Sequence, residues 1–597
     1  MIYSALPAFK KVLLLGPVFL ALITGAFLWG NPAPSQAQMA AAHAGSESDA
    51  QKSLVVESGL MGVLQDPQAT RHSFFDVAAL RGFYESRDNE PAWVRGRTRY
   101  QYKAHHILEV LEESWTHGLD PRKYHISEIK ALLDAPFGQR RFELELLLSD
   151  ALILYGRDLT GMRIDPEKRW GKIPQKVNYW RRPLEAREIL ERVSGTSDVK
   201  NALRSLEPEG KLYGALRREL VALASQPAED GNSPLHFKGV LRVGDEHKAV
   251  ADIRRYMGMD PEKALNGKYY YDDELAQEIM AFQYRHGLEP DGVIGPQTVA
   301  LMNVTRQDKI NQIVANLERL RWVEQNKPDR YILVNIPSAT LWAVDQGAVK
   351  LEMPVIVGKK GRPTNSFKTE ITGVRFNPNW TVPPTIKRDD FLPRLKEDPY
   401  YLSKRGIQIT QGSGRNARHV DPATIDWNTA TQRDLGQIRM VQSPGRSNPL
   451  GQVRVIMENP YNIYLHDTNK PEYFKKNSRA LSSGCIRVSK PKELAAFILD
   501  KNDGWSAQKA ENILASGRLT DIMTDEPLPV YILYQSVWQD DRGRIVFGAD
   551  LYGQDRQLIE ALSGKKGFQV PENLVKSAST LPLTGKKSGL ELGSVNQ

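Results

Sequence analysis

Two residues of the sequence, His466 and Cys485, form a pair that could carry out acyl transfer. A cysteine thiol with its ordinary pKa of about 8.5 is mostly protonated at neutral pH, so it needs a nearby base or cation to become a nucleophile. His466 stands at the predicted end of one strand, and Cys485 follows a Ser-Ser-Gly turn. If two neighbouring strand ends bring them together, the imidazole can take the thiol proton, and the sequence therefore predicts a cysteine nucleophile with a histidine base.

Three residues beside the cysteine could support this chemistry. Gly484 lets the backbone bend without a Cβ clash, so that N–H groups near Cys485, in the turn that includes Ser483, can point at a developing oxyanion. Arg487 lies two residues beyond Cys485, so in a strand its side chain shares the face of the thiol. There it could favour the thiolate or bind a substrate carboxylate. A purely structural ion pair of Arg487 is an equally good interpretation.

Cys485 is the only cysteine of the chain, which excludes an intramolecular disulfide and lipid attachment through an N-terminal cysteine. A lone cysteine is by itself more often a small buried hydrophobic residue, so its assignment depends on the local sequence. The chain has no His-Glu-x-x-His motif, and its 11 histidines are scattered, which argues against a zinc enzyme. We expect neither a metal nor an organic cofactor.

The length and composition indicate several globular domains. A chain of 597 residues is too long for one hydrophobic core. With 41% hydrophobic and 25% charged residues, the chain is neither wholly disordered nor a polytopic membrane protein. The net charge of +9 would suit nucleic acid, lipid headgroups or wall carboxylates, but it is small for this length. We expect no nucleic-acid partner.

Residues 1–37 have the pattern of an export signal. Lys10 and Lys11 precede an apolar run over residues 12–29, and Ser35 and Ala37 suit a cleavage site. Because a run of this length just spans a bilayer of about 30 Å, cleavage and anchoring both stay open. We expect contact with the membrane only through this segment, and a linker over residues 38–70.

The rest of the chain predicts a multidomain α+β protein. Apolar residues at helical spacing indicate a helical domain over residues 71–225, and Gly and Pro punctuation indicates three short helices over residues 238–305. A period of two indicates a mainly-β domain over residues 328–560, with a loop-rich capping subdomain over about 380–437. A disordered tail is expected over 564–597. The predicted strands include residues 331–336, 340–345, 349–357, 453–457 and 462–465, and a hairpin of 530–538 with 544–551.

Two stretches outside the cysteine segment carry family resemblances. The second domain resembles the peptidoglycan-binding domain family through Phe282-Gln283, His286-Gly287-Leu288, Asp291-Gly292, Ile294-Gly295-Pro296 and Thr298. The helical region resembles the scaffold domain of L,D-transpeptidases through Phe83-Tyr84, Gly118-Leu119-Asp120-Pro121 and Asp165-Pro166.

The cysteine segment itself resembles the active-site signature of the L,D-transpeptidases, the YkuD-type catalytic domain. The resemblance rests on His466 followed by Ser482-Ser483-Gly484-Cys485-Ile486-Arg487, with the upstream segment 354–359 and Pro363-Thr364. The order of domains resembles the large Gram-negative branch of that family. Many relatives have His-Gly-Thr and a histidine before Gly-Cys, where this chain has His466-Asp467-Thr468 and Ser483, so any role of the second histidine is absent here.

The resemblance implies the reaction. Cys485 would attack the carbonyl between meso-diaminopimelate and the terminal D-alanine of a tetrapeptide stem, and a second stem's amine would resolve the thioester into a 3-3 crosslink. His466 would move the protons, and a main-chain carbonyl near Asp467 would orient its ring. Tyr464 and Trp380 are predicted to contact the substrate. The implied setting is the periplasm, with stem peptides, glycan and other cell-wall synthases as partners, and carbapenems as acylating inhibitors.

Three other readings stay open. Water could resolve the thioester, which would make an L,D-carboxypeptidase, or a lysine amine of an outer-membrane lipoprotein could do so. A chain with an inert catalytic domain would be a wall-binding scaffold.

Overall fold

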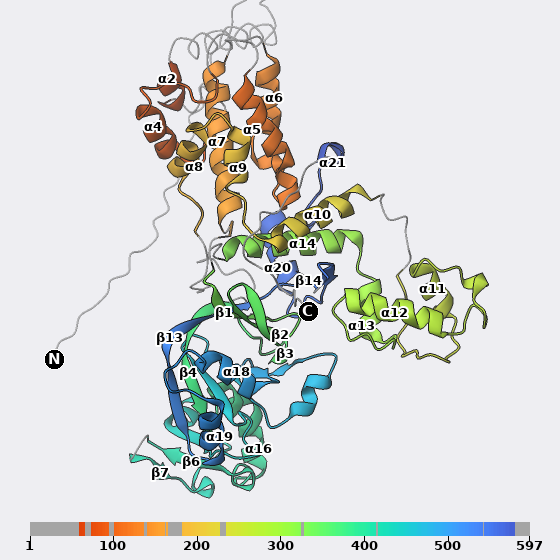
Figure 1. Ribbon diagram of the computed structural model, residues 1–597, viewed down its shortest axis with the longest axis vertical. Helices are drawn as coiled ribbons and strands as arrows, with labels where there is room; N and C mark the ends of the chain where they lie inside the picture. The colour runs from red at the N-terminus through yellow and green to blue at the C-terminus, as the bar shows by residue number, and fades with distance from the viewer. Residues whose placement is uncertain are drawn as a thin grey trace, which may run out of the picture.

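The computed structural model describes residues 59–65, 73–94, 101–135, 140–161, 163–164, 182–226, 234–323, 327–412, 416–540 and 542–578. Over these residues the chain forms a helical bundle, a layer of longer helices, a small three-helix domain and a large β-sheet with a cap (Figure 1). This confirms the predicted mixed α+β class. The predicted export signal lies outside the described residues. None of the helices in the described part of the chain has the length and hydropathy to span a membrane.

The N-terminal bundle has a core of its own. Its helices are α2 (Gly59–Gln65), α4 (Val77–Glu85), α5 (Tyr102–Glu112), α6 (Ile126–Asp134), α7 (Arg141–Thr160), α8 (Ala186–Ser194) and α9 (Val199–Arg204). The linker predicted over residues 38–70 is wrong where α2 forms, because Leu60 and Leu64 are buried in the bundle core. Two apolar residues at helical spacing suffice to dock a helix of two turns.

Two long helices connect the bundle to the sheet. α10 (Lys211–Ser225) packs against α14 (Arg306–Trp322), and both contribute to the hydrophobic core of the β domain rather than to that of the bundle. α20 (Gln554–Ser563) and α21 (Glu572–Ala578) complete this layer. The disordered tail predicted from residue 564 is wrong over its first part, because Phe568 is buried in this core and α21 packs on α10. The rest of the predicted tail lies outside the described residues.

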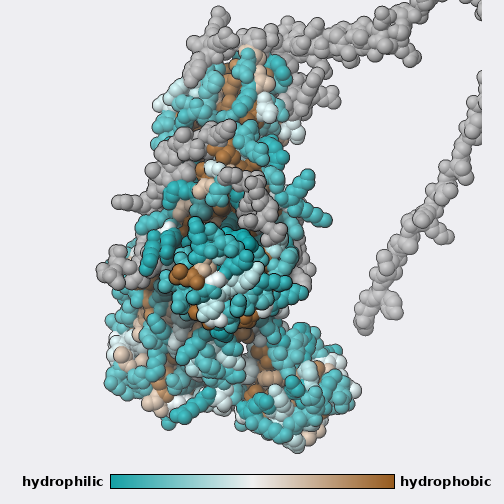
Figure 2. Space-filling view, turned by 90° about the vertical axis from the view of Figure 1, so that its right-hand side faces the viewer, coloured by the Kyte–Doolittle hydropathy of each residue, from teal (hydrophilic) through white to brown (hydrophobic). Residues whose placement is uncertain are grey.

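The small domain contains the three predicted helices, α11 (Ala249–Tyr256), α12 (Asp273–Arg285) and α13 (Pro296–Met302). The Asp272 carboxylate caps α12 by accepting the Leu275 N–H, and Pro296 opens α13. Gln283 donates to Asp291 and to the Val293 carbonyl, so this motif residue holds the domain together. Figure 2 looks onto the side of the molecule that carries this domain, where the surface is mostly hydrophilic.

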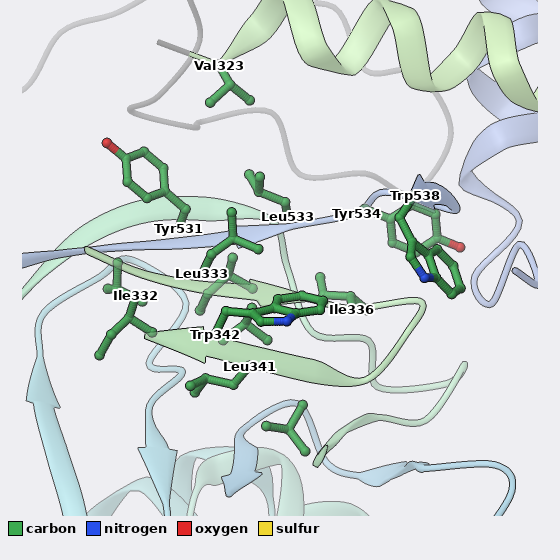
Figure 3. Close-up of a cluster of buried hydrophobic side chains, with 14 of the residues drawn as sticks. Val323, Ile332, Leu333, Ile336, Leu341, Trp342, Tyr531, Leu533, Tyr534 and Trp538 are labelled. Atoms are coloured by element: carbon green, nitrogen blue, oxygen red, sulfur yellow. The ribbon is translucent and has the colours of Figure 1, made fainter. Parts of the chain in front are cut away.

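The β domain is a nine-stranded sheet of order β11-β3-β12-β10-β9-β4-β13-β1-β2, in which β2 also pairs with β3, so the sheet closes on itself. Its strands are β1 (Arg330–Asn335), β2 (Thr340–Asp345), β3 (Ala348–Gly358), β4 (Phe367–Phe376), β9 (Val453–Met457), β10 (Leu465–His466), β11 (Ala480–Ser482), β12 (Ile486–Val488) and β13 (Thr520–Leu533). α18 (Pro491–Leu499) packs on β4, β9 and β13, and α19 (Ala507–Ala515) follows it. Figure 3 shows the core where β1, β2 and β13 meet, with Leu333, Trp342 and Leu533 among its side chains.

The hairpin predicted from residues 530–538 is wrong in its first half. Residues up to Leu533 belong to β13, and only β14 (Val537–Gln539) pairs with β15 (Ile545–Phe547). The chain leaves the sheet at Gln535 and Ser536, whose N–H groups donate to the side-chain amides of Asn335 and Asn316. These amides replace the ladder partners that a continuing strand would have had.

The cap has its own sheet of order β5-β8-β6-β7 and a separate core that includes Leu395, Ile409 and Met440. Its elements are β5 (Trp380–Thr381), α15 (Pro384–Ile386), a π-helical turn (Lys387–Phe391), α16 (Leu392–Glu397), β6 (Ile407–Gln411), β7 (Arg418–His419), α17 (Gln432–Gln437) and β8 (Ile438–Gln442). The cap sheet therefore extends to residue 442, five residues past the predicted boundary at 437.

Candidate active site

His466 and Cys485 lie at the ends of two adjacent parallel strands. In the ladder of β10 and β12, Leu465 pairs with Ile486 and His466 pairs with Arg487. Cys485 directly precedes β12, so it lies one position before the Leu465–Ile486 pair of this short ladder, and His466 lies one position after it. The thiol stands two residues from Arg487, and side chains two apart in a strand share a face. The imidazole and the thiol therefore belong to the same small region of the sheet.

The ring of His466 is buried and held by its own main chain. Nδ1 lies 2.5 Å from the carbonyl oxygen of Asp467, which can only accept, so Nδ1 carries the proton and Nε2 keeps its lone pair. Burial, with the charge of Arg487 next in size, lowers the pKa of His466 to about 3. Nε2 is consequently an unprotonated acceptor at neutral pH. This is the main-chain carbonyl near Asp467 to which the resemblance points.

The thiol of Cys485 is half-buried, with Sγ 3.7 Å from the carbonyl oxygen of Asn462. Burial raises the pKa of this thiol, against the opposing effect of hydrogen bonds with Tyr464 and of the charges of Arg454 and Arg487. At neutral pH the pair is therefore a thiol beside a neutral imidazole rather than an ion pair. Such a site transfers the proton as the nucleophile attacks.

The turn before Cys485 needs its glycine. Gly484 has φ +117°, which side chains with a Cβ rarely adopt. Its N–H donates to Ser482 Oγ at 3.1 Å, and the Ser482 hydroxyl donates to the Cys485 carbonyl at 2.5 Å. The Gly484 N–H is therefore used inside the turn, and Gly484 supports the position of Cys485 rather than offering this N–H to an oxyanion.

A second layer of hydrogen bonds fixes the same turn from the loop after β3. The Thr364 hydroxyl donates to the Gly484 carbonyl at 2.7 Å and accepts the Gly358 N–H at 2.9 Å. The Tyr552 hydroxyl accepts the Thr364 N–H and donates to the Gly358 carbonyl. The turn with Cys485 is thus tied to residues more than 60 positions away on both sides.

The structure brings most of the predicted supporting residues together. Tyr464 contacts both members of the pair, with its ring centroid 5.6 Å from that of His466 and its hydroxyl interacting with Cys485. The exposed Ser483 accepts a hydrogen bond from Arg362 at 3.1 Å. Arg487 is half-buried and donates to Thr468 Oγ1 at 3.5 Å. Within the described residues Arg487 forms no ion pair with a carboxylate, so the structural ion pair is not formed there.

Trp380 is placed differently from these residues. It belongs to β5 of the cap, and its ring packs edge-on against Phe391 at 6.1 Å. Its contacts are those of a cap residue, and a contact with substrate stays a prediction.

Sequence reasoning missed Ser482, Thr364, Tyr552 and Arg454 as parts of the site. Ser482 and Thr364 stood in segments that carried the resemblance, so their hydroxyl groups were an available signal. Tyr552 and Arg454 gave no signal, because their contacts join segments that are far apart in the chain or in different elements. Across the described ranges, no group of three or more His, Cys, Asp and Glu side chains is arranged to hold a metal ion.

Three families match the chain. Residues 329–524 match the L,D-transpeptidase catalytic domain (YkuD), residues 78–220 match the scaffold domain, and residues 260–302 match the "Putative peptidoglycan binding domain". A curated relative, the "Putative L,D-transpeptidase" of Haemophilus influenzae, is 36% identical over 257 residues, which cover 42% of this chain and 50% of the relative. The chain thus spans about half the length of that relative.

Two solved structures are similar at a lower level. The L,D-transpeptidase of Xylanimonas cellulosilytica is 14% identical, and the match covers 50% of this chain and 100% of that one with a TM-score of 0.16. The L,D-transpeptidase of Stackebrandtia nassauensis is 13% identical, and the match covers 50% and 96% with a TM-score of 0.18.

Proposed function

Because the chain carries an L,D-transpeptidase catalytic domain together with a scaffold domain and a peptidoglycan-binding domain, we propose that it forms 3-3 crosslinks between peptidoglycan stems. The observation that carries this proposal is the placement of Cys485 and His466 inside the matched catalytic domain, on adjacent strand ends, with the imidazole held in the tautomer of a base. The peptidoglycan-binding domain supports the same substrate.

The reaction has two acyl transfers. Cys485 Sγ attacks the carbonyl of meso-diaminopimelate while His466 Nε2 takes the thiol proton. The C–N bond then breaks, and D-alanine leaves with the proton that His466 returns to its amine. The side-chain amine of a second stem attacks the thioester, gives its proton to His466, and forms the new amide as the thiol is released. Each half-reaction restores the neutral imidazole, and no cofactor takes part.

The N–H of Cys485 is the candidate donor to the oxyanion of both steps. It has no acceptor among the described main-chain contacts, whereas the neighbouring Ile486 N–H donates to the Tyr464 carbonyl and the Gly484 N–H donates to Ser482. A donor in this position could stabilise the tetrahedral intermediate.

The proposed setting is the periplasm, with stem peptides and glycan as the bound polymer and other cell-wall synthases as candidate partners. Export would depend on the segment over residues 1–37, which lies outside the described residues. Carbapenems are expected to acylate Cys485, because a strained lactam resembles the acyl donor.

The test is intact mass spectrometry of the chain after incubation with tetrapeptide-containing disaccharide dimers or with meropenem, beside analysis of the muropeptides. A covalent adduct that is absent in Cys485→Ala, together with 3-3 dimers, is the expected result. His466→Gln should lose most of the adduct, and His419→Gln, which changes an exposed histidine of the cap, should keep it. An adduct with only tripeptide product would instead make the chain an L,D-carboxypeptidase.

Transfer to a lysine of a lipoprotein would appear as a peptide-linked lysine when such an acceptor is added. Neither adduct nor product, from a folded protein that still binds peptidoglycan, would make the chain a wall-binding scaffold.

A further inference from the structure

Two arginines flank His466 in the sheet. In the β9–β10 ladder His466 pairs with Arg454, and in the β10–β12 ladder it pairs with Arg487. Residues that are directly paired in adjacent strands project to the same face of the sheet. One row of the sheet therefore carries a guanidinium on each side of the imidazole.

Neither arginine has a carboxylate partner within the described residues. Arg454 stacks on the ring of Tyr464, with its guanidinium carbon 4.2 Å from the ring centroid, and its buried Nε has no hydrogen-bond partner. Arg487 makes only the 3.5 Å contact with Thr468 Oγ1. Tyr464 in turn contacts Cys485, so this one tyrosine contacts both the Arg454 guanidinium and the thiol.

Other arginines nearby are neutralised. Arg375 occupies the next place in the same row, paired with Arg454 across β4 and β9, and it binds Asp521 through two 2.7 Å hydrogen bonds. Arg362 binds Asp390 and Asp389. A half-buried cation without a counter-ion costs free energy, and that cost is removed when an anion binds. Unlike Arg375, neither Arg454 nor Arg487 forms an ion pair with a carboxylate in the described part of the chain, and the Asp521 carboxylate acts on Arg454 only at longer range, past Arg375.

We propose that Arg454 and Arg487 form a carboxylate-binding site that receives the free carboxylate of the acyl donor, on the amino acid that leaves. This inference deepens the proposed function and rests on it. A donor with a free carboxylate one residue beyond the scissile amide would place that anion against the two guanidinium groups while its carbonyl faces Cys485. The same two charges also oppose protonation of His466, so they would favour both binding and the base.

The test compares a stem tetrapeptide that ends in a free carboxylate with the same peptide ending in a carboxamide. Wild-type enzyme should use the carboxylate form with the lower KM. In Arg454→Gln, KM for the carboxylate form should rise by roughly 10- to 100-fold, the range expected for one lost hydrogen bond to a charged group. KM for the carboxamide should change by less than about threefold, and any fall in kcat should be the same for both peptides. Arg454→Lys, which keeps the charge, should recover part of the loss.

The control is the double variant Arg375→Gln with Asp521→Asn, which removes a neutralised pair from the same row and should leave the preference intact. Binding of both peptides to Cys485→Ala protein, measured by calorimetry, repeats the comparison without chemistry. If wild-type protein prefers the carboxylate in binding but forms no acyl-enzyme, the proposed function fails and the carboxylate site stands. Equal losses on both peptides in Arg454→Gln, or no preference in the wild type, would overturn the site.

Discussion

At the scale of single residues, the protonation states of His466 and Cys485 set the pH dependence of the site. Burial leads both groups to their neutral forms, since it lowers the pKa of the imidazole to about 3 and raises that of the thiol. A base with an ordinary pKa of about 6.5 would gain a proton as the pH falls below that value and lose activity. His466 should stay an acceptor until the pH approaches its own lower pKa.

We therefore expect alkylation of Cys485 by iodoacetamide to keep accelerating as the pH rises past 9, because the thiolate forms only above the ordinary thiol pKa. The rate should be measured from pH 6 to 10 by intact mass. No other thiol competes, since Cys485 is the only cysteine. A rate that is already at its plateau near pH 7 would mean that the resting pair is a thiolate and an imidazolium, contrary to this account.

A glycine outside the signature should also control the base. Gly451 has φ +60°, and a Cβ at this position would overlap the carboxylate of Asp467, whose carbonyl holds the His466 ring. Gly451→Ala should displace Asp467 and lower kcat/KM by roughly 10- to 100-fold, because a catalytic group about 1 Å out of place loses this much.

Gly406→Ala is the matched control for that variant. Gly406 has a similar φ of +68° but open space around the added Cβ, so it introduces the backbone strain without the clash. Circular dichroism and thermal unfolding should show similar stability for both variants. Equal activity of the two would show that the position of Asp467 does not matter to the base.

At the scale of elements, Arg362 connects the cap to the turn that carries the nucleophile. Its guanidinium donates to Asp390 at 2.5 Å and to Ser483 Oγ at 3.1 Å, so it joins the π-helical turn of the cap to the residue two positions before Cys485. Arg362→Ala should increase amide hydrogen exchange in residues 384–397 and slow acylation several-fold.

The cost in global stability should stay below about 1 kcal/mol, because Asp389 and Asp390 are well exposed to solvent. Arg388→Ala is the control, since Arg388 binds only Asp389 on the same cap. If both variants change exchange and acylation alike, the link to Ser483 has no part in the effect.

The elements that the sequence predicted well are those with strong local patterns. Alternation marked Val453–Met457 to the residue, and Gly and Pro punctuation marked the three short helices of the small domain, because turn signals and periodicity are local physical effects. The same local logic failed at Gln535 and Ser536, where side-chain amides from distant elements take the backbone N–H groups. No window of sequence contains those partners.

The residues of the site also divide into those that local sequence predicts and those that it does not. His466, Gly484 and Cys485 could be predicted from their residue types and spacing, whereas Arg454 joins the site only through the β9–β10 ladder. The use of the Gly484 N–H by Ser482 was also invisible, because it depends on a rotamer within the turn. The sequence therefore predicted the reacting groups more completely than it predicted the groups that hold them in place.

At the scale of the whole molecule, α14 links the helical bundle to the catalytic sheet through buried charges. Glu318 on this helix accepts hydrogen bonds from the Arg163 side chain at 2.6 Å and from Arg321 at 3.2 Å, and all three side chains are buried. Arg321 also donates to the His117 carbonyl of the bundle. These buried charges therefore join the bundle side to α14, which itself packs on the sheet through the shared hydrophobic core.

Removing the charge of Glu318 should weaken the connection between the helical bundle and α14. Burial alone would raise the pKa of Glu318, but the charges of Arg163 and Arg321 lower it below its usual range, so the carboxylate is ionised in the folded state. Its contribution to stability is present above the ordinary glutamate pKa of about 4.3 and is lost as the pH falls through the lower folded value. Glu318→Gln leaves two buried cations without their anion and should cost about 3–5 kcal/mol in urea unfolding.

The control is Glu191→Gln on α8, which breaks an exposed pair with Arg187 and should cost less than about 1 kcal/mol. Hydrogen exchange should then rise more in α14 and in residues 113–117 of the Glu318 variant than in the strands that carry His466 and Cys485, because the network contacts the first two segments directly. If Glu318→Gln unfolds at the same urea concentration as Glu191→Gln, the network does not join the domains, and apolar packing of α10 on α14 must do so instead.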